Sequence, residues 1–277
     1  MAAASSTAAA TNRKGEWMET LRWGYRAILG LALLAGGLYA FHETEQHLIS
    51  DARFRFLGPP EYGMDPPGLK IEGVSFASRK QILDVFADDF GKSVYMLPIE
   101  KRRASLRRLE WVRDVTVARF WPNQVLVKID ERIPVALLQA DAKRGWLVDA
   151  DGILLSIPSQ STFRVPVVKG VSGKDSAAQR SERIKRMLRV MAESGRHAER
   201  FTMVDVSDMD NVKVSLMVGD RRLLLWLGGR NFQSRLDGFE ASYPRVMREM
   251  PNDTAFDLRL DSRISNVPAT GEDVRGE

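Results

Sequence analysis

The sequence predicts an α+β protein in which a single N-terminal transmembrane helix precedes two further domains. Three observations predict this class. One apolar run lies near the N-terminus of the 277-residue chain. Short segments with the two-residue alternation of strands follow it. Amphipathic helical segments are interspersed among these strands, so the domains are mixed rather than all-β or all-α.

The apolar run covers residues 23–41, and Arg26 is its only charged residue. At about 1.5 Å per residue it spans roughly 28 Å, close to the thickness of a bilayer core. Basic residues precede it at Arg13, Lys14 and Arg22, which predicts a cytoplasmic N-terminus and periplasmic domains, a type II topology. A cleaved signal peptide is the competing interpretation, but Leu38 is bulky where such a cleavage site needs a small residue.

Two segments flank this helix. Residues 1–22 are predicted to be a disordered cytoplasmic tail, since the first of them are rich in Ala, Ser and Thr. Residues 42–68 are predicted to be a spacer, because "FLGPPEYGMDPPG" is dense in proline and glycine. A second disordered tail is expected over residues 268–277.

Composition argues against several classes of function. The net charge is +5, but acidic residues are interleaved with the basic ones and no phosphate-binding face stands out, so no nucleic-acid partner is expected. The absence of cysteine excludes disulfides, Cys-ligated zinc and a thiol nucleophile, and it suits an oxidising compartment. The three scattered histidines predict no metal site, and we expect no cofactor, catalytic residue or small-molecule substrate.

The first domain is predicted to have the order β-α-α-β-β. A short strand ends at Gly73, and helices follow with apolar faces that include Ile82, Phe86 and Leu106. In "QVLVKIDE" the alternation predicts a strand, joined to the preceding one by the Trp121-Pro122 turn. The strand is expected to run on into "ERIPVALL".

These residues resemble a POTRA domain, most closely that of the FtsQ/DivIB bacterial cell-division proteins. The resemblance rests on Gly73, "LEWV" at residues 109–112, the "FWPNQV" turn and the "ERIPVALL" exit. The domain is expected over residues 69–137.

The second domain, expected over residues 138–267, begins with a hairpin in "GWLVDADGILLSIP". The pair Asp149 and Asp151 is interpreted as turn chemistry rather than catalysis. A strand in "RVPVVKGV", an amphipathic helix, the hairpin "NVKVSLMVGDRRLLLWLG" and a further helix follow. "TAFDLRLDSRISNVP" is predicted to be the last strand, in which Phe256, Leu258 and Leu260 alternate.

The second domain is similar to the FtsQ-type β-domain. The shared residues are Leu227-Gly228, Arg235-Leu236, Phe239, Tyr243-Pro244 and "DLRLDS" at 257–262. The resemblance implies a non-enzymatic, single-pass scaffold of the divisome in the inner membrane at the septum. Its β-domain would bind FtsB-like and FtsL-like coiled-coil proteins by strand addition, and its POTRA domain would take part in recruitment. The partner-binding edge implied here is Arg259, Leu260, Asp261, Ser262, Arg263 and Ile264.

Two departures from the family bear on that edge: Leu260 stands where an aromatic residue is common, and Arg263 where Gly or Asn is common. The alternative function is a POTRA-containing envelope assembly or chaperone-like binding protein outside division. An enzyme is disfavoured because no histidine lies near a candidate nucleophile in the sequence. An outer-membrane barrel is disfavoured because the second domain carries helices instead of a long series of strands.

Overall fold

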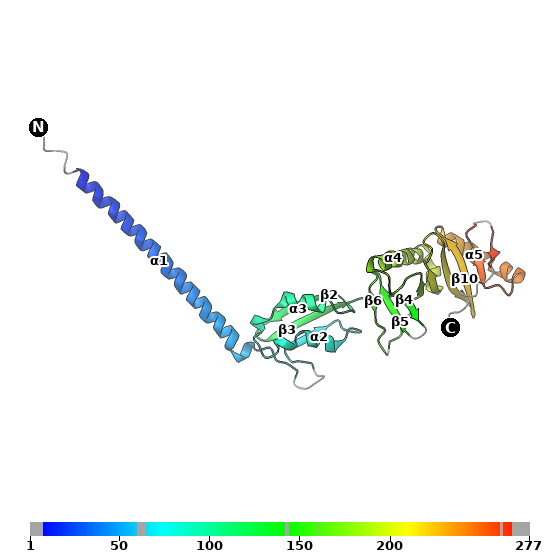
Figure 1. The fold of residues 1–277 in the computed structure, drawn as a ribbon, viewed down its shortest axis with the longest axis horizontal. Helices are drawn as coiled ribbons and strands as arrows, with labels where there is room; N and C mark the ends of the chain where they lie inside the picture. Colours follow the sequence, from blue (N-terminus) through cyan, green and yellow to red (C-terminus); the bar gives the residue numbers. More distant parts are fainter. Residues whose placement is uncertain (1–7, 60–64, 142–143, 160, 261–262, 268–277) are drawn as a thin grey trace. The chain divides into compact units, whose positions relative to one another are not determined.

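The computed structural model of the chain describes residues 8–59, 65–141, 144–159, 161–260 and 263–267 (Figure 1). The chain divides into two compact units. One contains Met1–Glu72, Lys80–Ala104 and Thr116–Lys128, and the other contains Gly73–Arg79, Ser105–Val115 and Ile129–Glu277.

Helix α1 runs from Ala8 to Ser50 and is longer than the predicted span. It takes in much of the stretch expected to be a disordered tail and the beginning of the expected spacer. No proline interrupts this stretch, so the helix that the apolar run favours can continue in both directions. Its part from Leu21 to Ser50 is apolar and long enough to cross a bilayer, which fits the transmembrane segment expected from the sequence.

The segment after α1 is not the simple spacer that its composition predicts. The 3-10 helix η1, Ala52–Phe54, comes first. Phe56 is then buried, with its ring centroid 4.9 Å from that of Phe90 and 6.2 Å from that of Phe86. The backbone of Phe56 also bonds to Lys92 and Gly91. The Phe56 side chain therefore fixes this segment to the first domain. The proline and glycine content of the segment does not indicate this contact.

The first domain contains a three-stranded sheet in the order β1-β3-β2. Strand β1 pairs with β3 in parallel. The burial of β3 alternates as predicted, with Val125, Val127 and Ile129 buried. The elements are β1 (Leu69–Glu72), α2 (Arg79–Val85), η2 (Ala87–Asp89), η3 (Val94–Met96), α3 (Ile99–Leu106), β2 (Val112–Phe120) and β3 (Gln124–Glu131). The predicted β-α-α-β-β order is therefore confirmed.

The residues that mark the POTRA-like pattern have structural explanations. Gly73 has a φ of +77°, and a Cβ there would lie 2.1 Å from the Ile129 carbonyl oxygen, so only glycine fits. After it, one carboxylate oxygen of Glu131 accepts hydrogen bonds from the backbone N–H groups of Ser75, Phe76 and Ala77. The basic run of α3 is only partly a solvated face: Lys101 is exposed and Arg103 pairs with Glu100 at the surface, whereas Arg102 and its partner Asp89 are largely buried.

The expected continuation of β3 into "ERIPVALL" is wrong. Strand β3 ends at Glu131, and β4 (Pro134–Asp141) belongs to the other sheet, where it pairs with β5 and β7. Pro134 lacks a backbone N–H, which favours a strand boundary there. Residues 134–137, expected in the first domain, therefore form part of a strand of the second sheet.

The second sheet has nine strands in the order β12-β11-β10-β9-β8-β7-β4-β5-β6. Its elements after β4 are β5 (Arg144–Asp149), β6 (Leu154–Leu155), β7 (Val167–Lys169), α4 (Ala177–Glu193), η4 (Gly195–Arg200), β8 (Phe201–Asp205), β9 (Val212–Val218), β10 (Arg221–Gly228), α5 (Phe232–Glu249), β11 (Ala255–Asp257) and β12 (Ser265–Asn266). Strand β8 is an element that the sequence interpretation did not identify. The two predicted hairpins, β5–β6 and β9–β10, are confirmed.

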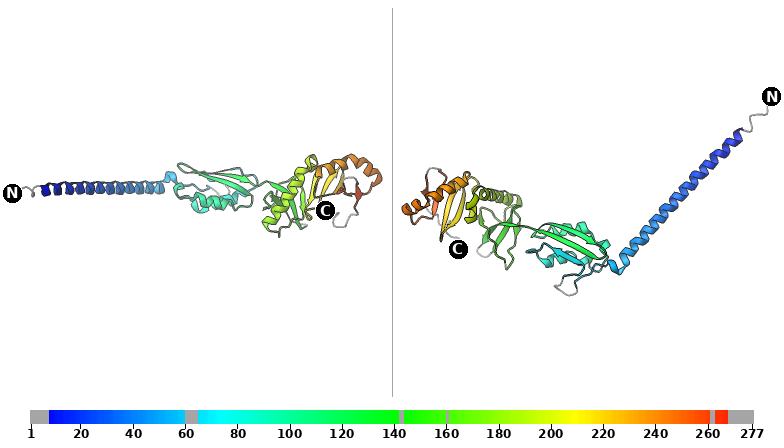
Figure 2. Two further views of the ribbon diagram at one scale, coloured as in Figure 1. Left: turned by 90° about the horizontal axis from the view of Figure 1, so that it is seen from above. Right: turned by 180° about the vertical axis from the view of Figure 1, so that it is seen from behind.

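Helices α4 and α5 share one hydrophobic core with the central strands, and they lie beside the same sheet in both views of Figure 2. Ile184 and Met187 of α4, Phe239 of α5, and Val214 and Leu225 of the sheet belong to this core. Side chains on the opposite side of β9 and β10 are less buried, as Lys213 and Trp226 show.

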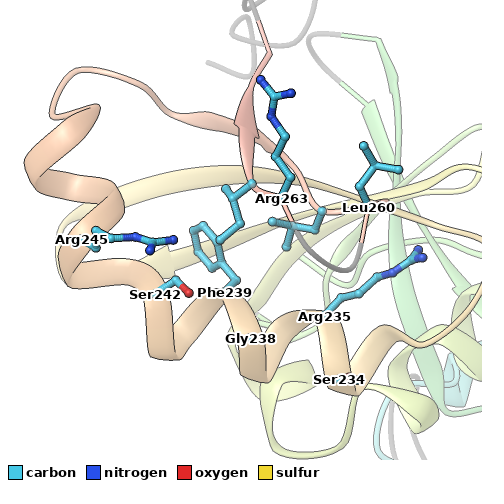
Figure 3. A pocket seen from close by; sticks show the side chains of 10 residues that line it. Ser234, Arg235, Gly238, Phe239, Ser242, Arg245, Leu260 and Arg263 are labelled. Atoms are coloured by element: carbon cyan, nitrogen blue, oxygen red, sulfur yellow. The ribbon is translucent and has the colours of Figure 1, made fainter.

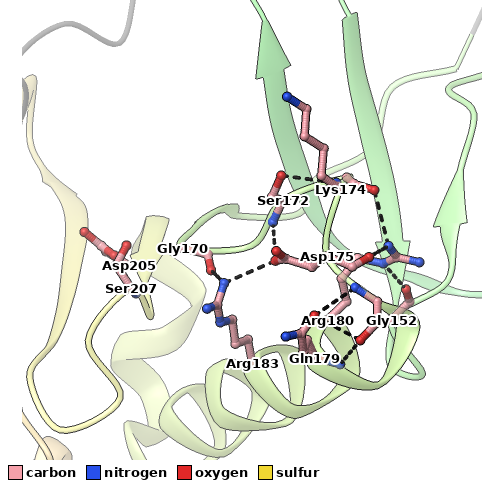
Figure 4. Close-up of polar contacts among 12 residues, drawn as sticks. Gly152, Gly170, Ser172, Lys174, Asp175, Gln179, Arg180, Arg183, Asp205 and Ser207 are labelled. Carbon is pink, nitrogen blue, oxygen red and sulfur yellow. Dashed lines mark hydrogen bonds and ion pairs between the residues drawn. The ribbon is translucent and has the colours of Figure 1, made fainter.

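Loops are fastened to α4 by arginine side chains (Figure 4). A capping box of Ser176 and Gln179 begins the helix. Arg180 Nε donates to the Gly152 carbonyl at 2.8 Å, and Arg183 Nη1 donates to the Gly170 carbonyl. These bonds tie the turns after β5 and β7 to the helix layer.

The Asp149 turn is structural, as predicted. One oxygen of Asp149 accepts from the backbone N–H groups of Asp151 and Ile153, and the other accepts from Arg132 at 2.6 Å. Both oxygens of this buried carboxylate are therefore engaged in fixing the turn.

Candidate functional site

The candidate site is the C-terminal corner of the nine-stranded sheet, where β11, β12 and the segment between them lie beside α5. Strand β11 pairs with β10 in parallel and with β12 in antiparallel orientation. Strand β12 is therefore the edge strand on this side. Of the six predicted partner-binding residues, Arg259, Leu260, Arg263 and Ile264 are described, and Asp261 and Ser262 lie outside the described residues.

The prediction of one continuous last strand is wrong. Strand β11 ends at Asp257, the chain bends at Arg259 and Leu260, and β12 then returns along β11. The side chain of Asp257 explains the bend: it accepts a hydrogen bond from the backbone N–H of Arg259 at 2.9 Å. Such a bond offers the backbone an alternative to the strand ladder.

Arg259 is held in a defined position at this bend. Its guanidinium donates to Asp257 through Nε and Nη2, and its Cζ lies 5.0 Å from the centroid of the Trp226 ring. Lys213 Nζ lies 4.5 Å from the centroid of the same ring. Arg235 of α5 donates to the Arg259 carbonyl at 2.8 Å. The Arg259 side chain still has 44% of its surface exposed, so a cation is fixed in place yet accessible.

The ion pair shifts the two pKa values in opposite directions, and each shift favours the charged form. The hydrogen bond from Arg259 is the largest influence that lowers the pKa of Asp257, and burial opposes it. The same hydrogen bond raises the pKa of Arg259. Both groups are therefore charged near neutral pH.

A pocket lies between α5 and the segment after β11 (Figure 3). Arg235, Arg245 and Arg263 stand around it together with Ser242, and Phe239 lies at its floor. Leu260, which also lines the pocket, has 66% of its surface exposed. A cationic, partly apolar surface of this kind suits an acidic protein segment that carries an apolar side chain.

The residues that hold Arg259 in position were not identified from the sequence. Trp226 and Arg235 lie in earlier elements, and only folding brings them to Arg259. The true edge residues Ser265 and Asn266 were included in a longer strand. The Asp-x-Arg spacing of 257 and 259 is the one local signal that could have indicated the bend.

A second polar cluster lies between η4 and α5. His197, expected in a polar loop, is buried, and its Nε2 lies 2.9 Å from Asp237 Oδ1. Glu240 completes a group that could in principle hold a metal ion. Arg196 pairs with both carboxylates, and Arg200 pairs with Glu240, so the acidic charge is already offset by two guanidinium groups.

Comparison with known proteins identifies both domains. Residues 68–132 match the model of the POTRA domain, FtsQ-type, and residues 136–259 match that of the cell division protein FtsQ/DivIB C-terminal domain. The second match begins within β4, which agrees with the place of this strand in the second sheet.

Relatives named cell division protein FtsQ match this chain over different lengths. The cell division protein FtsQ of Koribacter versatilis is 29% identical over 244 residues, which cover 86% of this chain and 67% of that protein. The FtsQ of Syntrophotalea carbinolica is 22% identical over 219 residues, 76% of this chain and 75% of that protein. The FtsQ of Rickettsia felis is 33% identical over 86 residues, 31% of this chain and 32% of that protein. With both domain matches and the N-terminal apolar helix, this chain belongs to the FtsQ/DivIB family of bacterial cell-division proteins.

Proposed function

We propose that this chain is a non-enzymatic, single-pass scaffold of the divisome that captures FtsB-like and FtsL-like coiled-coil proteins by strand addition at β12. Its POTRA domain takes part in recruitment to the septum. The N-terminus lies in the cytoplasm and the two domains in the periplasm. The observation that carries the proposal is the short edge strand β12 beside the fixed cation Arg259.

The open side of β12 follows from its pairing with β11. The Val267 N–H donates to the Ala255 carbonyl at 3.0 Å, and Phe256 lies opposite Asn266. In an antiparallel ladder alternate residues direct their backbone groups to opposite sides. The N–H and C=O groups of Asn266 therefore point away from β11, where an added strand would bond.

The side chains around this edge supply selectivity. Arg259, Leu260, Asp261, Ser262, Arg263 and Ile264 remain the proposed partner-binding residues, and Asn266 joins them as the backbone contact. The fixed cation of Arg259 and the arginine side chains around the Figure 3 pocket favour an acidic partner segment. The exposed Leu260 offers an apolar contact beside them.

The anchor sets the compartment of these domains. Residues 23–41 of α1 are the proposed membrane span, and basic residues precede them at Arg13, Lys14 and Arg22. The positive-inside rule then places both domains outside the cytoplasm. A reporter active only in the periplasm, fused after Glu277, checks this orientation.

The edge is tested by Asn266→Pro in the full-length chain, co-expressed with the FtsB-like and FtsL-like proteins of the same organism. Proline removes the outward N–H but no bond to β11, so we expect the protein to fold and lose its partners. Asn266→Ala keeps the N–H and is the matched control, which should retain them. If both variants fold and bind the FtsB-like and FtsL-like proteins equally well, the strand-addition mechanism is wrong.

A further inference from the structure

The turn between β2 and β3 exposes two large aromatic side chains that the proposed function does not use. Phe120 is 52% exposed and Trp121 is 55% exposed. A turn that faces only water requires no aromatic side chain. Neighbouring exposed aromatic side chains are typical of a surface that binds a protein or a membrane.

This turn lies beside the C-terminal end of α1. The ring of Trp121 meets that of Phe54, in η1, edge-to-face with centroids 5.5 Å apart. Ser93 Oγ donates to the Leu48 carbonyl in the last turn of α1 at 2.7 Å, and Arg55 forms an isolated bridge with Ser93. The aromatic turn is thus fastened to the segment that leaves the helix.

The length of α1 places this junction close to a bilayer surface. From Phe41 to Ser50 the helix rises roughly 14 Å at about 1.5 Å per residue. A headgroup layer is about 5 to 8 Å thick, and helices tilt by about 20° on average, which shortens the rise along the membrane normal. Long side chains at the junction can therefore bridge the remaining distance to the headgroups.

The chemistry of the junction suits phospholipid. Tryptophan prefers the membrane interface, because its ring is apolar and its N–H is polar. Arg53, Arg55 and Lys92 are exposed basic residues in the same part of the unit. Asp51 is an acid in the same segment, and the hydrogen bond from Arg53 lowers its pKa to about 2, so this carboxylate is already paired.

We propose that the Trp121 turn rests on the phospholipid headgroups, with Phe120 and Trp121 at the interface and Arg55 and Lys92 facing lipid phosphates. This inference depends on the membrane anchoring proposed above. The contact would hold the POTRA domain close to the bilayer and restrict the angles at which it can meet other membrane proteins.

The absence of cysteine allows a direct test in the full-length chain. The Gln124→Cys variant places a fluorophore at an exposed position beside the turn. It is reconstituted in nanodiscs of phosphatidylethanolamine and phosphatidylglycerol that contain lipids with a quencher on the headgroup. Phe41→Cys reports on the anchor. Lys80→Cys is the distant control, since β1 and the chain after it run away from the turn along β3.

We expect quenching at positions 124 and 41 but not at position 80. Adding Phe120→Ser and Trp121→Ser should abolish the quenching at 124 and leave that at 41. Both side chains are exposed, so folding should be retained. Raising the salt concentration should weaken the contact in nanodiscs rich in phosphatidylglycerol.

Four outcomes would overturn the inference. Quenching at 41 without quenching at 124 would leave the anchor intact and the turn free for a protein partner. Quenching at neither position would remove the anchoring itself, and the lipid contact with it. Equal quenching at 124 and 80 would indicate non-specific adsorption. Quenching at 124 that survives the double serine change would show that the aromatic side chains are not the contact.

Discussion

Two sheet edges in this protein are built in opposite ways. Strand β2 is nine residues long and ends the three-stranded sheet, while β12 has two residues and ends the nine-stranded sheet. Charged side chains line β2: Arg113 pairs with Asp130, and Asp114 pairs with Arg107. Strand β12 carries only Ser265 and Asn266.

The difference shows how an edge can be protected or kept available. A long edge offers many unpaired backbone groups, and charged side chains discourage another strand from joining it. A two-residue edge offers few such groups, so it can remain uncharged without becoming a general site of aggregation. A partner that must recognise β12 then depends on nearby side chains such as Arg259 and Leu260.

The largest expected change in stability comes from the hydrophobic core next to the C-terminal edge strand. Phe256 of β11 is fully buried, and its ring lies 5.5 Å from that of Phe239. Phe256→Ala should lower the free energy of unfolding by about 3 to 5 kcal/mol, since it leaves a cavity. Phe120→Ala, at the exposed end of β2, is the control and should change it by less than about 0.5 kcal/mol.

Urea unfolding followed by circular dichroism measures both variants. A Phe256→Ala protein as stable as the Phe120→Ala protein would mean that β11 contributes little to the core, and the edge would be a loosely attached segment.

A smaller, pH-dependent effect on stability is expected from the ion pair of Asp257 and Arg259 at the bend after β11. Because Arg259 lowers the pKa of Asp257, the pair stabilises the fold fully above the unfolded pKa of about 3.9. The contribution is lost as the pH falls through the lower, folded value. Asp257→Asn should therefore be less stable than the parent at neutral pH, and the difference should vanish in strong acid.

Unfolding midpoints of the two proteins across this acid range provide the measurement. Parallel curves, with a constant difference down to the lowest pH, would show that the Asp257 carboxylate makes no pH-linked contribution.

The smallest effect on stability is expected from the ion pair between Arg113 of β2 and Asp130 of β3. The side chains of Arg113 and Asp130 are 54% and 52% exposed, so their ion pair is screened by water. A double-mutant cycle with Arg113→Ala and Asp130→Ala should give a coupling below about 1 kcal/mol, which falls further at high salt. A coupling of several kcal/mol would mean that these charges stabilise the sheet rather than protect its edge.

The sequence alone predicted the elements whose signals are local. The β9–β10 hairpin and the alternation of β3 were identified because each strand shows its own two-residue period. Helix α4 was recognised from its apolar face. The Asp149 turn followed from side chains that bond to nearby backbone groups.

Errors arose where distant residues decide the outcome. Leu258 and Leu260 continue the alternation of β11, but the bond from Arg259 to Asp257 turns the chain away. His197 and Phe56 lie in polar or proline-rich stretches, and both are buried by partners far along the chain.

Sequence by itself therefore determined the apolar helix, the order of the first domain, the main hairpins and the family resemblance, because each rests on local periodicity or on a motif. Only the tertiary structure decided that β4 belongs to the second sheet and that β12 is the edge. It also decided that Trp226, Asp257 and Arg235 together hold Arg259. Strand pairing and side-chain contacts between distant residues depend on which surfaces meet during folding, and no local pattern encodes that choice.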